Sequence, residues 1–178
     1  MAGDHSTYAE KLVRCWHPVA YSSTLADTPM ATTLLGEAVV LWRTADGGAH
    51  AMRDLCIHRG TALSLGWVAD DCIVCPYHAW RYDKSGACVR IPQSALGTIP
   101  VKARTPVYQC QERYGLIWVC LAGGEPAYLL PEVPELESGT HKVVNTGPFA
   151  WRSDASRQRS EQITTRGKYY RQINNPCF

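Results

Sequence analysis

The sequence predicts a mostly β fold made of antiparallel sheets, and two observations support this prediction. First, apolar and β-branched segments are short, and turn-forming residues separate them at short intervals. Second, residues 38–42 (Ala-Val-Val-Leu-Trp) run toward the turn sequence Ala-Asp-Gly-Gly at 45–48, and residues 50–52 begin a returning strand, which is the pattern of a β-hairpin. Successive strands are therefore expected to pair with the chain reversing direction between them.

The other elements follow along the chain. Residues 7–15 predict a short helical lead-in, and residues 82–86 (Tyr-Asp-Lys-Ser-Gly) predict a second turn. A buried strand is expected over residues 116–121, entered through the turn at Tyr114 and Gly115. One more strand is expected near residues 142–145. The residues expected in the core are Trp16, Trp42, Trp118, Cys88, Cys110 and Cys120.

Composition and charge narrow the possible classes. The chain has 178 residues, of which 46% are hydrophobic and 19% are charged, so most of it is expected to be globular. A net charge of +2 gives no reason to expect nucleic acid or an anionic membrane as a partner. The longest apolar runs are far too short to span a membrane. No export signal is recognised at the start, so a cytoplasmic location is expected.

Changes in composition predict four segments. Residues 1–15 form an N-terminal lead-in, and residues 16–122 form the main domain, with a smaller subdomain over about residues 53–92. Residues 123–158 begin with an acidic, proline-rich linker. Residues 159–178 form a basic tail without apolar periodicity, for which a flexible end is favoured over a nucleic-acid-binding arm.

The strongest chemical signal is a pair of Cys/His motifs. The chain has eight cysteines, and without an export signal a cluster of Cys and His favours a metal site over disulfides. One residue separates Cys56 from His58, sixteen residues separate His58 from Cys75, and two residues separate Cys75 from His78. Two Cys and two His are the ligand set of a Rieske [2Fe-2S] cluster, in which two His replace two Cys on one iron. Cys56, His58, Cys75 and His78 are therefore the predicted metal and cofactor ligands.

The mixed ligand set affects the redox chemistry. With two ferric ions, two sulfides, two thiolates and two neutral imidazoles, the oxidised centre carries no net charge. An all-thiolate cluster is two units more negative and accepts an electron less readily, so imidazole ligands raise the reduction potential.

A zinc site is the alternative interpretation, because two Cys and two His also bind zinc and Cys72 forms a C-x-x-C pair with Cys75. However, the first pair has one intervening residue, whereas zinc pairs usually have two to four. Each pair also mixes Cys with His, unlike the usual order in zinc fingers. The sequence therefore favours iron and sulfur, with Cys72 as a strand residue.

Residues around these motifs resemble the Rieske family. Cys56-Ile57-His58-Arg59-Gly60 and the run from Cys75 to Asp83 are similar to the two cluster loops of Rieske non-haem iron oxygenases. The segments 16–20 (Trp-His-Pro-Val-Ala) and 112–118 (Glu-Arg-Tyr-Gly-Leu-Ile-Trp) are similar too. The resemblance covers about residues 12–158 and is to the N-terminal Rieske domain of the large (α) subunit, with Ala79 standing where Gly is commoner. It implies the Rieske iron–sulfur fold, with a small cluster-binding subdomain.

The resemblance also distinguishes branches of the family. Rieske proteins of respiratory complexes usually have one more Cys in each loop, forming a disulfide, but the corresponding residues here are Thr61 and Tyr77. Trp80 stands where those proteins tend to have a Ser whose hydroxyl donates to the cluster. Fewer donors leave the reduced state less stabilised. A potential at the low end of the Rieske range is expected.

In complete oxygenases this domain precedes a catalytic domain in which two His and a carboxylate hold a mononuclear iron. Residues 151–158 resemble the approach to that domain, so 123–158 is expected to include a truncated start of it. Residues 159–178 contain no His, so the mononuclear Fe(II) is expected only in a complete or partner chain. The implied partners are an NAD(P)H-dependent reductase or a ferredoxin, and either a homotrimer or a separate catalytic domain. A truncation, a frame-shifted product and a split subunit all remain open.

Two neighbouring residues and one other function complete the sequence interpretation. Arg59 either places positive charge beside the cluster or pairs with Asp54 or another acid, and Trp80 either shields the cluster or packs as a core residue. The function that the resemblance implies is the electron-transfer component of a ring-hydroxylating or demethylating oxygenase, which passes reductase-derived electrons to a mononuclear iron site outside this chain. The alternative function is a stand-alone Rieske-type ferredoxin, an electron carrier that is not an enzyme.

Overall fold

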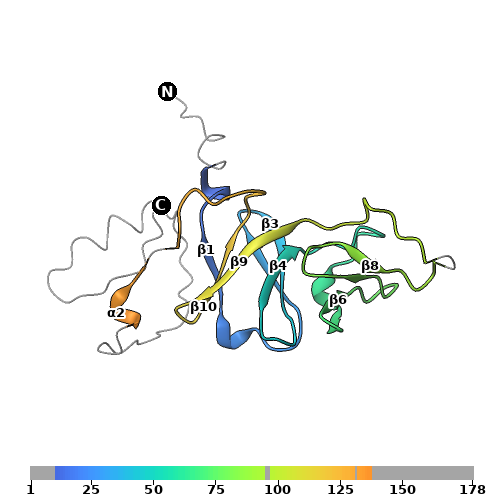
Figure 1. Cartoon of the computed structure of the whole chain (residues 1–178), viewed down its shortest axis with the longest axis horizontal. Helices are drawn as coiled ribbons and strands as arrows, with labels where there is room; N and C mark the ends of the chain where they lie inside the picture. The colour runs from blue at the N-terminus through green and yellow to red at the C-terminus, as the bar shows by residue number, and fades with distance from the viewer. Residues whose placement is uncertain (1–10, 95–96, 131, 138–178) are drawn as a thin grey trace, which may run out of the picture.

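The computed structural model describes residues 11–94, 97–130 and 132–137. Within these ranges the chain forms one six-stranded and one four-stranded sheet with antiparallel pairing (Figure 1), which confirms the mostly β prediction. The large sheet has the order β1-β10-β9-β4-β3-β2. Its strands are β1 (His17–Tyr21), β2 (Met30–Leu34), β3 (Glu37–Arg43), β4 (Ala49–Arg53), β9 (Val107–Arg113) and β10 (Leu116–Cys120).

The small sheet has the order β5-β6-β7-β8 and is inserted between β4 and β9 of the large sheet. Its strands are β5 (Trp67–Ala69), β6 (Cys72–Val74), β7 (Arg81–Tyr82) and β8 (Cys88–Arg90). Figure 1 shows this sheet toward one end of the long axis of the molecule, with the short helix α2 (Pro134–Glu137) toward the other. Two short 3-10 helices, η1 (Ser22–Thr24) and η2 (Leu63–Leu65), complete the described elements. The small sheet lies within residues 53–92, whose role as a separate subdomain stays a prediction.

The expected hairpins form. Strands β3 and β4 pair around the turn at 45–48, and β7 and β8 pair around a turn in which Asp83 Oδ1 accepts the backbone N–H of Ser85 at 2.8 Å and of Ala87 at 3.1 Å. Strands β9 and β10 turn through Tyr114 (φ 58°) and Gly115 (φ 72°), the left-handed pair that a two-residue hairpin requires. Cys72 begins β6 as a strand residue, as predicted.

At the two ends of the chain the sequence predictions are tested only in part. Residues 11–13 are helical, in agreement with the predicted lead-in. The rest of that lead-in before residue 11, the strand expected near 142–145 and the basic tail 159–178 lie outside the described residues.

Strand β3 explains why the two sheets hold together. Val39 and Leu41 pack into a core cluster inside the large sheet, whereas Val40 and Trp42 pack into a second cluster shared with the small sheet. All four side chains are fully buried. Because successive side chains of a strand point to opposite faces, a continuous apolar run is what a strand with two covered faces needs.

The second of these clusters, shared with the small sheet, includes two of the predicted metal ligands. It contains Cys56 and Cys75 together with Trp42, Met52 and Tyr82. The predicted core positions Trp16, Trp42, Trp118, Cys88 and Cys120 are buried, and Cys110 packs against the core while staying partly exposed.

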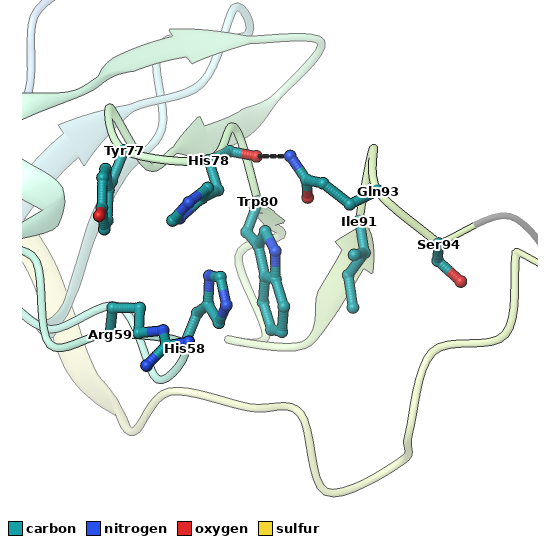
Figure 2. A pocket seen from close by; sticks show the side chains of 8 residues that line it. All are labelled: His58, Arg59, Tyr77, His78, Trp80, Ile91, Gln93 and Ser94. Carbon is teal, nitrogen blue, oxygen red and sulfur yellow. Dashed lines mark hydrogen bonds between the residues drawn. The ribbon is translucent and has the colours of Figure 1, made fainter.

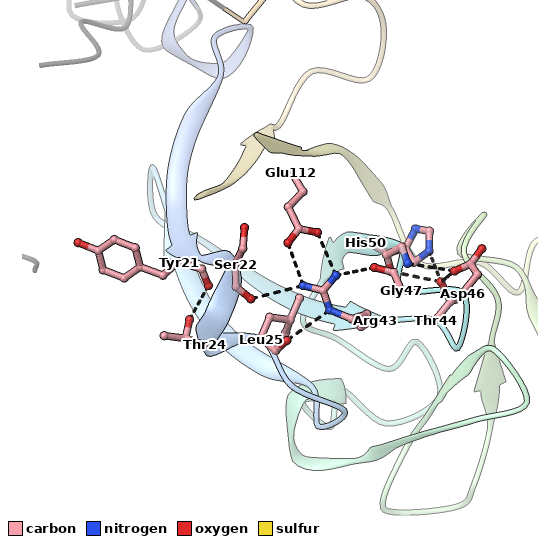
Figure 3. A network of polar contacts seen from close by, with 11 residues as sticks. Tyr21, Ser22, Thr24, Leu25, Arg43, Thr44, Asp46, Gly47, His50 and Glu112 are labelled. Atoms are coloured by element: carbon pink, nitrogen blue, oxygen red, sulfur yellow. Dashed lines mark hydrogen bonds and ion pairs between the residues drawn. The ribbon is translucent and has the colours of Figure 1, made fainter. Parts of the chain in front are cut away.

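An arginine network links separate elements of the large sheet. The Arg43 guanidinium donates two hydrogen bonds to the Glu112 carboxylate, at 2.9 and 3.2 Å, and donates to the carbonyls of Ser22 and Leu25 at 3.4 and 3.3 Å (Figure 3). The hydrogen bonds from Arg43 hold the pKa of Glu112 below its usual value. The network joins β3, β9 and η1, and it contains none of the predicted ligands.

Among the helices of the described ranges, none is long and apolar enough to cross a membrane.

Candidate metal centre

Two loops carry the predicted ligands. The first loop, residues 56–61, follows β4, and the second loop, residues 75–80, directly connects β6 to β7. Asp54, just before the first loop, accepts hydrogen bonds from the backbone N–H of Ser64 at 2.7 Å and from its hydroxyl at 2.6 Å. These bonds tie the start of the first loop to η2 behind it.

The two loops share one backbone hydrogen-bond scheme. In the first loop the carbonyl of Cys56 accepts the N–H of Gly60 at 2.8 Å, and the N–H of Cys56 donates to the carbonyl of Thr61 at 2.8 Å. In the second loop Cys75 makes the same two bonds, to the residues four and five positions later, at 3.0 and 2.9 Å. Each cysteine is thereby held at the closed end of a compact loop.

Both loops use a left-handed backbone conformation at the fourth residue after the cysteine. Gly60 has φ 73° and Ala79 has φ 55°. Glycine adopts this region freely, whereas a residue with a Cβ is strained there. The departure noted at Ala79 therefore has a physical consequence, because the second loop carries strain that the first loop avoids.

Sulfur and imidazole lie at different depths. Cys56 and Cys75 are each only 1% exposed, whereas His58 and His78 are partly exposed. Cys56 and Cys75 belong to the same core cluster, and the neighbouring Cys56 is one of the groups that raise the pKa of the Cys75 thiol. The site therefore has an inner pair of sulfurs and an outer pair of imidazoles.

The two imidazoles face a common space (Figure 2). Their ring centroids lie 4.6 Å apart with an interplanar angle of 59°. Nδ1 of His78 is buried and has no hydrogen-bond partner. A buried ring nitrogen without a partner is costly, so this atom indicates a group that the protein is built to bind.

Sequence reasoning missed the hydrogen bond between Tyr82 and Cys56. The Tyr82 hydroxyl lies 3.2 Å from Cys56 Sγ, and Tyr82 is fully buried. Sequence analysis offered no role for this hydroxyl, although a buried tyrosine usually places its O–H against a partner. Tyr82 therefore places a buried hydroxyl against the sulfur of one predicted ligand.

Arg59 does not form the ion pair with Asp54 that one alternative offered. Asp54 is bonded to Ser64, and in the part of the chain that the structure describes no ion pair involves Arg59. Arg59 is exposed and lines the same open groove as His58 and His78. Its charge therefore lies beside the outer imidazoles.

The protonation of the site follows from its burial. Burial raises the pKa of the Cys75 thiol, and backbone N–H groups of Tyr77 and His78 oppose this shift. Desolvation lowers the pKa of His58, and the nearby His78 and Arg59 lower it further. The shift at His58 favours the neutral imidazole, the form that binds metals, and the Cys75 thiol has to release a proton when a metal binds.

An open groove of about 470 Å³ lies over the outer imidazoles. Trp80, Tyr77 and Gln93 contribute to its walls. Gln93 Nε2 donates a hydrogen bond to the carbonyl of His78 at 2.9 Å (Figure 2), which fastens the second loop to the segment after β8. No sequence pattern indicated Gln93, because its contact depends on how the segment after β8 folds back.

The four predicted ligands form two pairs and not one tetrahedral set. No group of three or more His, Cys, Asp or Glu side chains within the described ranges is arranged to hold a single metal ion. The four residues lie as an inner Cys pair and an outer His pair.

Comparison with known proteins identifies the family. Residues 15–105 match the family model described as the Rieske [2Fe-2S] domain. This chain belongs to the Rieske family. The resemblance to oxygenase α subunits found in the sequence is confirmed, since the similar proteins include the methylxanthine N1-demethylase NdmA of Pseudomonas putida. It is 37% identical over 157 residues, which cover 84% of this chain and 44% of the relative.

Other relatives extend this similarity. The aminopyrrolnitrin oxygenase PrnD of Pseudomonas fluorescens is 40% identical, covering 69% of this chain and 35% of the relative. Among solved structures, NdmA of Pseudomonas putida CBB5 superposes with a TM-score of 0.63 at 37% identity, covering 72% of this chain and 42% of that chain. Dicamba monooxygenase bound to dicamba superposes with a TM-score of 0.64 at 29% identity, covering 71% of this chain and 38% of that chain. The Rieske chain thus spans less than half the length of these relatives.

Proposed function

We propose that this chain binds a Rieske-type [2Fe-2S] cluster and serves as the electron-transfer part of a non-haem iron oxygenase. Cys56 and Cys75 would hold one iron, and His58 and His78 would hold the other. When bound, such a cluster takes up and releases one electron at a time. The observation that carries the proposal is the buried Cys pair below the partly exposed His pair, with Nδ1 of His78 buried and unpartnered.

The burial and the chemistry of the four predicted ligands fit a Rieske-type cluster. The thiols lie in the core cluster, where the loop backbone holds each cysteine at both its N–H and its carbonyl. The imidazoles lie at the groove, so an electron would leave or enter through His58 or His78. Arg59 beside them would favour the more negative reduced state. The potential is expected toward the low end of the Rieske range, moderated by the Tyr82 hydroxyl at Cys56.

The wider role is inferred from the relatives. An NAD(P)H-dependent reductase or a ferredoxin would supply the electrons, in the cytoplasm, where NAD(P)H is available. The acceptor would be a mononuclear iron in a catalytic domain, in a homotrimer or a partner chain. Ring hydroxylation or oxidative demethylation is the expected reaction, because the relatives bear names such as methylxanthine N1-demethylase and phenoxybenzoate dioxygenase subunit alpha. The stand-alone carrier is less supported, since these relatives are oxygenases.

Metal analysis of the purified chain tests the cluster. We expect two irons and two acid-labile sulfides per chain, with the electron paramagnetic resonance (EPR) signal of a Rieske centre after reduction. Cys75→Ser should lose the iron and sulfide. Cys72→Ser is the matched control, because Cys72 is a free cysteine three residues earlier in β6, and it should keep both. Stoichiometric zinc without sulfide would contradict the proposal and support the zinc alternative.

A further inference from the structure

Trp80 makes a contact that joins the two loops. Its indole stacks on the imidazole of His58, with ring centroids 4.5 Å apart and an interplanar angle of only 4° (Figure 2). Trp80 belongs to the second loop and His58 to the first. A side chain from the second loop, which carries Cys75 and His78, thus lies flat against His58, a predicted ligand in the first loop.

The corresponding contact at His78 is different. The ring of Tyr77 lies 3.9 Å from that of His78, but the two planes are tilted by 47° and Tyr77 is 63% exposed. Tyr77 also precedes His78 directly in the chain, so this contact is local. Only the His58 contact is a parallel stack across the two loops.

Trp80 is well placed to hold its partner still. Its carbonyl accepts the N–H of Cys75 at 2.9 Å, and its side chain packs against the core cluster that contains Cys56 and Cys75. Its Nε1 is buried and has no hydrogen-bond partner in the structure. The indole is therefore held by its backbone and by the core, and the imidazole of His58 lies against a fixed surface.

We propose that Trp80 is a positioning residue that fixes the plane of the His58 imidazole by stacking across the loops. The proposal rests on the proposed function, in which His58 binds the outer iron. A flat, anchored indole restricts rotation of the imidazole about its bond to Cβ, and it covers one face of the ring. The aromatic plane of Trp80, and not its N–H group, carries this role.

Pulsed EPR of the reduced full-length chain tests the proposal, because the ¹⁴N hyperfine couplings report how each histidine ring is oriented toward the iron. Trp80→Met fills much of the space but has no aromatic ring, whereas Trp80→Phe keeps an aromatic ring and removes the N–H group. We expect Trp80→Met to broaden or shift the couplings of one histidine and leave the other unchanged. We expect Trp80→Phe to keep both near their wild-type values. Trp67→Met, at a half-exposed tryptophan in β5, should change neither.

Unchanged couplings in Trp80→Met would overturn the proposal, as would equal changes in Trp80→Phe and Trp80→Met, which would assign the effect to the N–H group. If Trp80→Met does not fold, Trp80→Phe decides: wild-type couplings support the stack, and altered couplings reject it. A wild-type chain without a Rieske EPR signal would instead refute the proposed function, which separates the two failures.

Discussion

The two loops of the candidate centre have the same backbone but different surroundings. Each cysteine makes the same pair of hydrogen bonds, to residues four and five positions later. Yet the histidine follows two residues after Cys56 and three residues after Cys75. The two imidazoles nevertheless come within 4.6 Å of each other. The common backbone holds the sulfurs in place, and the different spacing still lets both rings reach one space.

The differences lie in the side chains that act on each loop. The first loop has glycine at its left-handed position, a tyrosine hydroxyl at its sulfur and a stacked indole on its imidazole. The second loop has a strained alanine, backbone N–H groups of Tyr77 and His78 that lower the pKa of its thiol, and an exposed tyrosine beside its imidazole. Similar loop backbones can thus give their ligands unequal support.

Of the changes that test the difference between the two loops, exchanging each histidine for cysteine should have the largest effect, and that effect is on the reduction potential. His58→Cys and His78→Cys each replace a neutral ligand by an anion, so both should keep a cluster and lower its potential by on the order of 100 mV. The decrease should be smaller at position 58, because the positive charge of Arg59 offsets the new thiolate. Protein-film voltammetry measures both values.

His50→Gln is the control for this pair, since His50 lies at the β3–β4 hairpin and contacts Thr44 at 3.1 Å. Its potential should equal that of the wild type. An unchanged potential in His58→Cys or His78→Cys would reject that residue as a ligand.

Removing the hydroxyl at Cys56 should have an intermediate effect. Tyr82→Phe deletes a donor that stabilises the more negative, reduced state, so the potential should fall by roughly 20 to 60 mV. Tyr108→Phe is the matched control, because its hydroxyl donates to Glu37 at 2.7 Å in the large sheet and not to a predicted ligand. Redox titration followed by EPR measures both variants. Equal potentials for wild type and Tyr82→Phe would show that this bond does not tune the centre.

Exchanging the residues at the left-handed positions should have the smallest effect, and the signs should be opposite. Ala79→Gly relieves strain, and Gly60→Ala introduces it, each by about 1 kcal/mol or roughly 2 to 4 °C in Tm. A Cβ at position 60 meets only Leu55 Cδ1, at 3.9 Å, so backbone strain is isolated there from crowding. Differential scanning calorimetry of the cluster-loaded chain measures the shifts. A Tm that falls in both variants would contradict the strain argument.

Much of the fold could be predicted because its signals are local. Residues 38–52 carry strand, turn and returning strand within one short segment, and the structure forms that hairpin. Tyr114 and Gly115 likewise predicted the turn that joins β9 and β10. The joining of the strands into two sheets could not be predicted, because pairing between β4 and β9 brings together residues more than fifty positions apart.

The candidate site likewise has a part that the sequence predicted and a part that it did not. Cys56, His58, Cys75 and His78 were chosen from spacing alone, because a small metal group needs its ligands on compact loops. The side chains that contact these ligands could not be predicted from spacing. The Tyr82–Cys56 bond, the Trp80–His58 stack and the clamp from Gln93 all join residues that are distant in sequence or on different loops.

Residue types at short spacing were enough to predict the mostly antiparallel strands and turns, the family and the candidate ligands. The tertiary structure alone decided which ligands are deep and which are outer, and which side chains donate to them, stack on them or strain their loops. These depths and contacts could not be predicted from the sequence because they depend on how the core between the two sheets packs. That packing is a sum of many long-range interactions that no local pattern encodes.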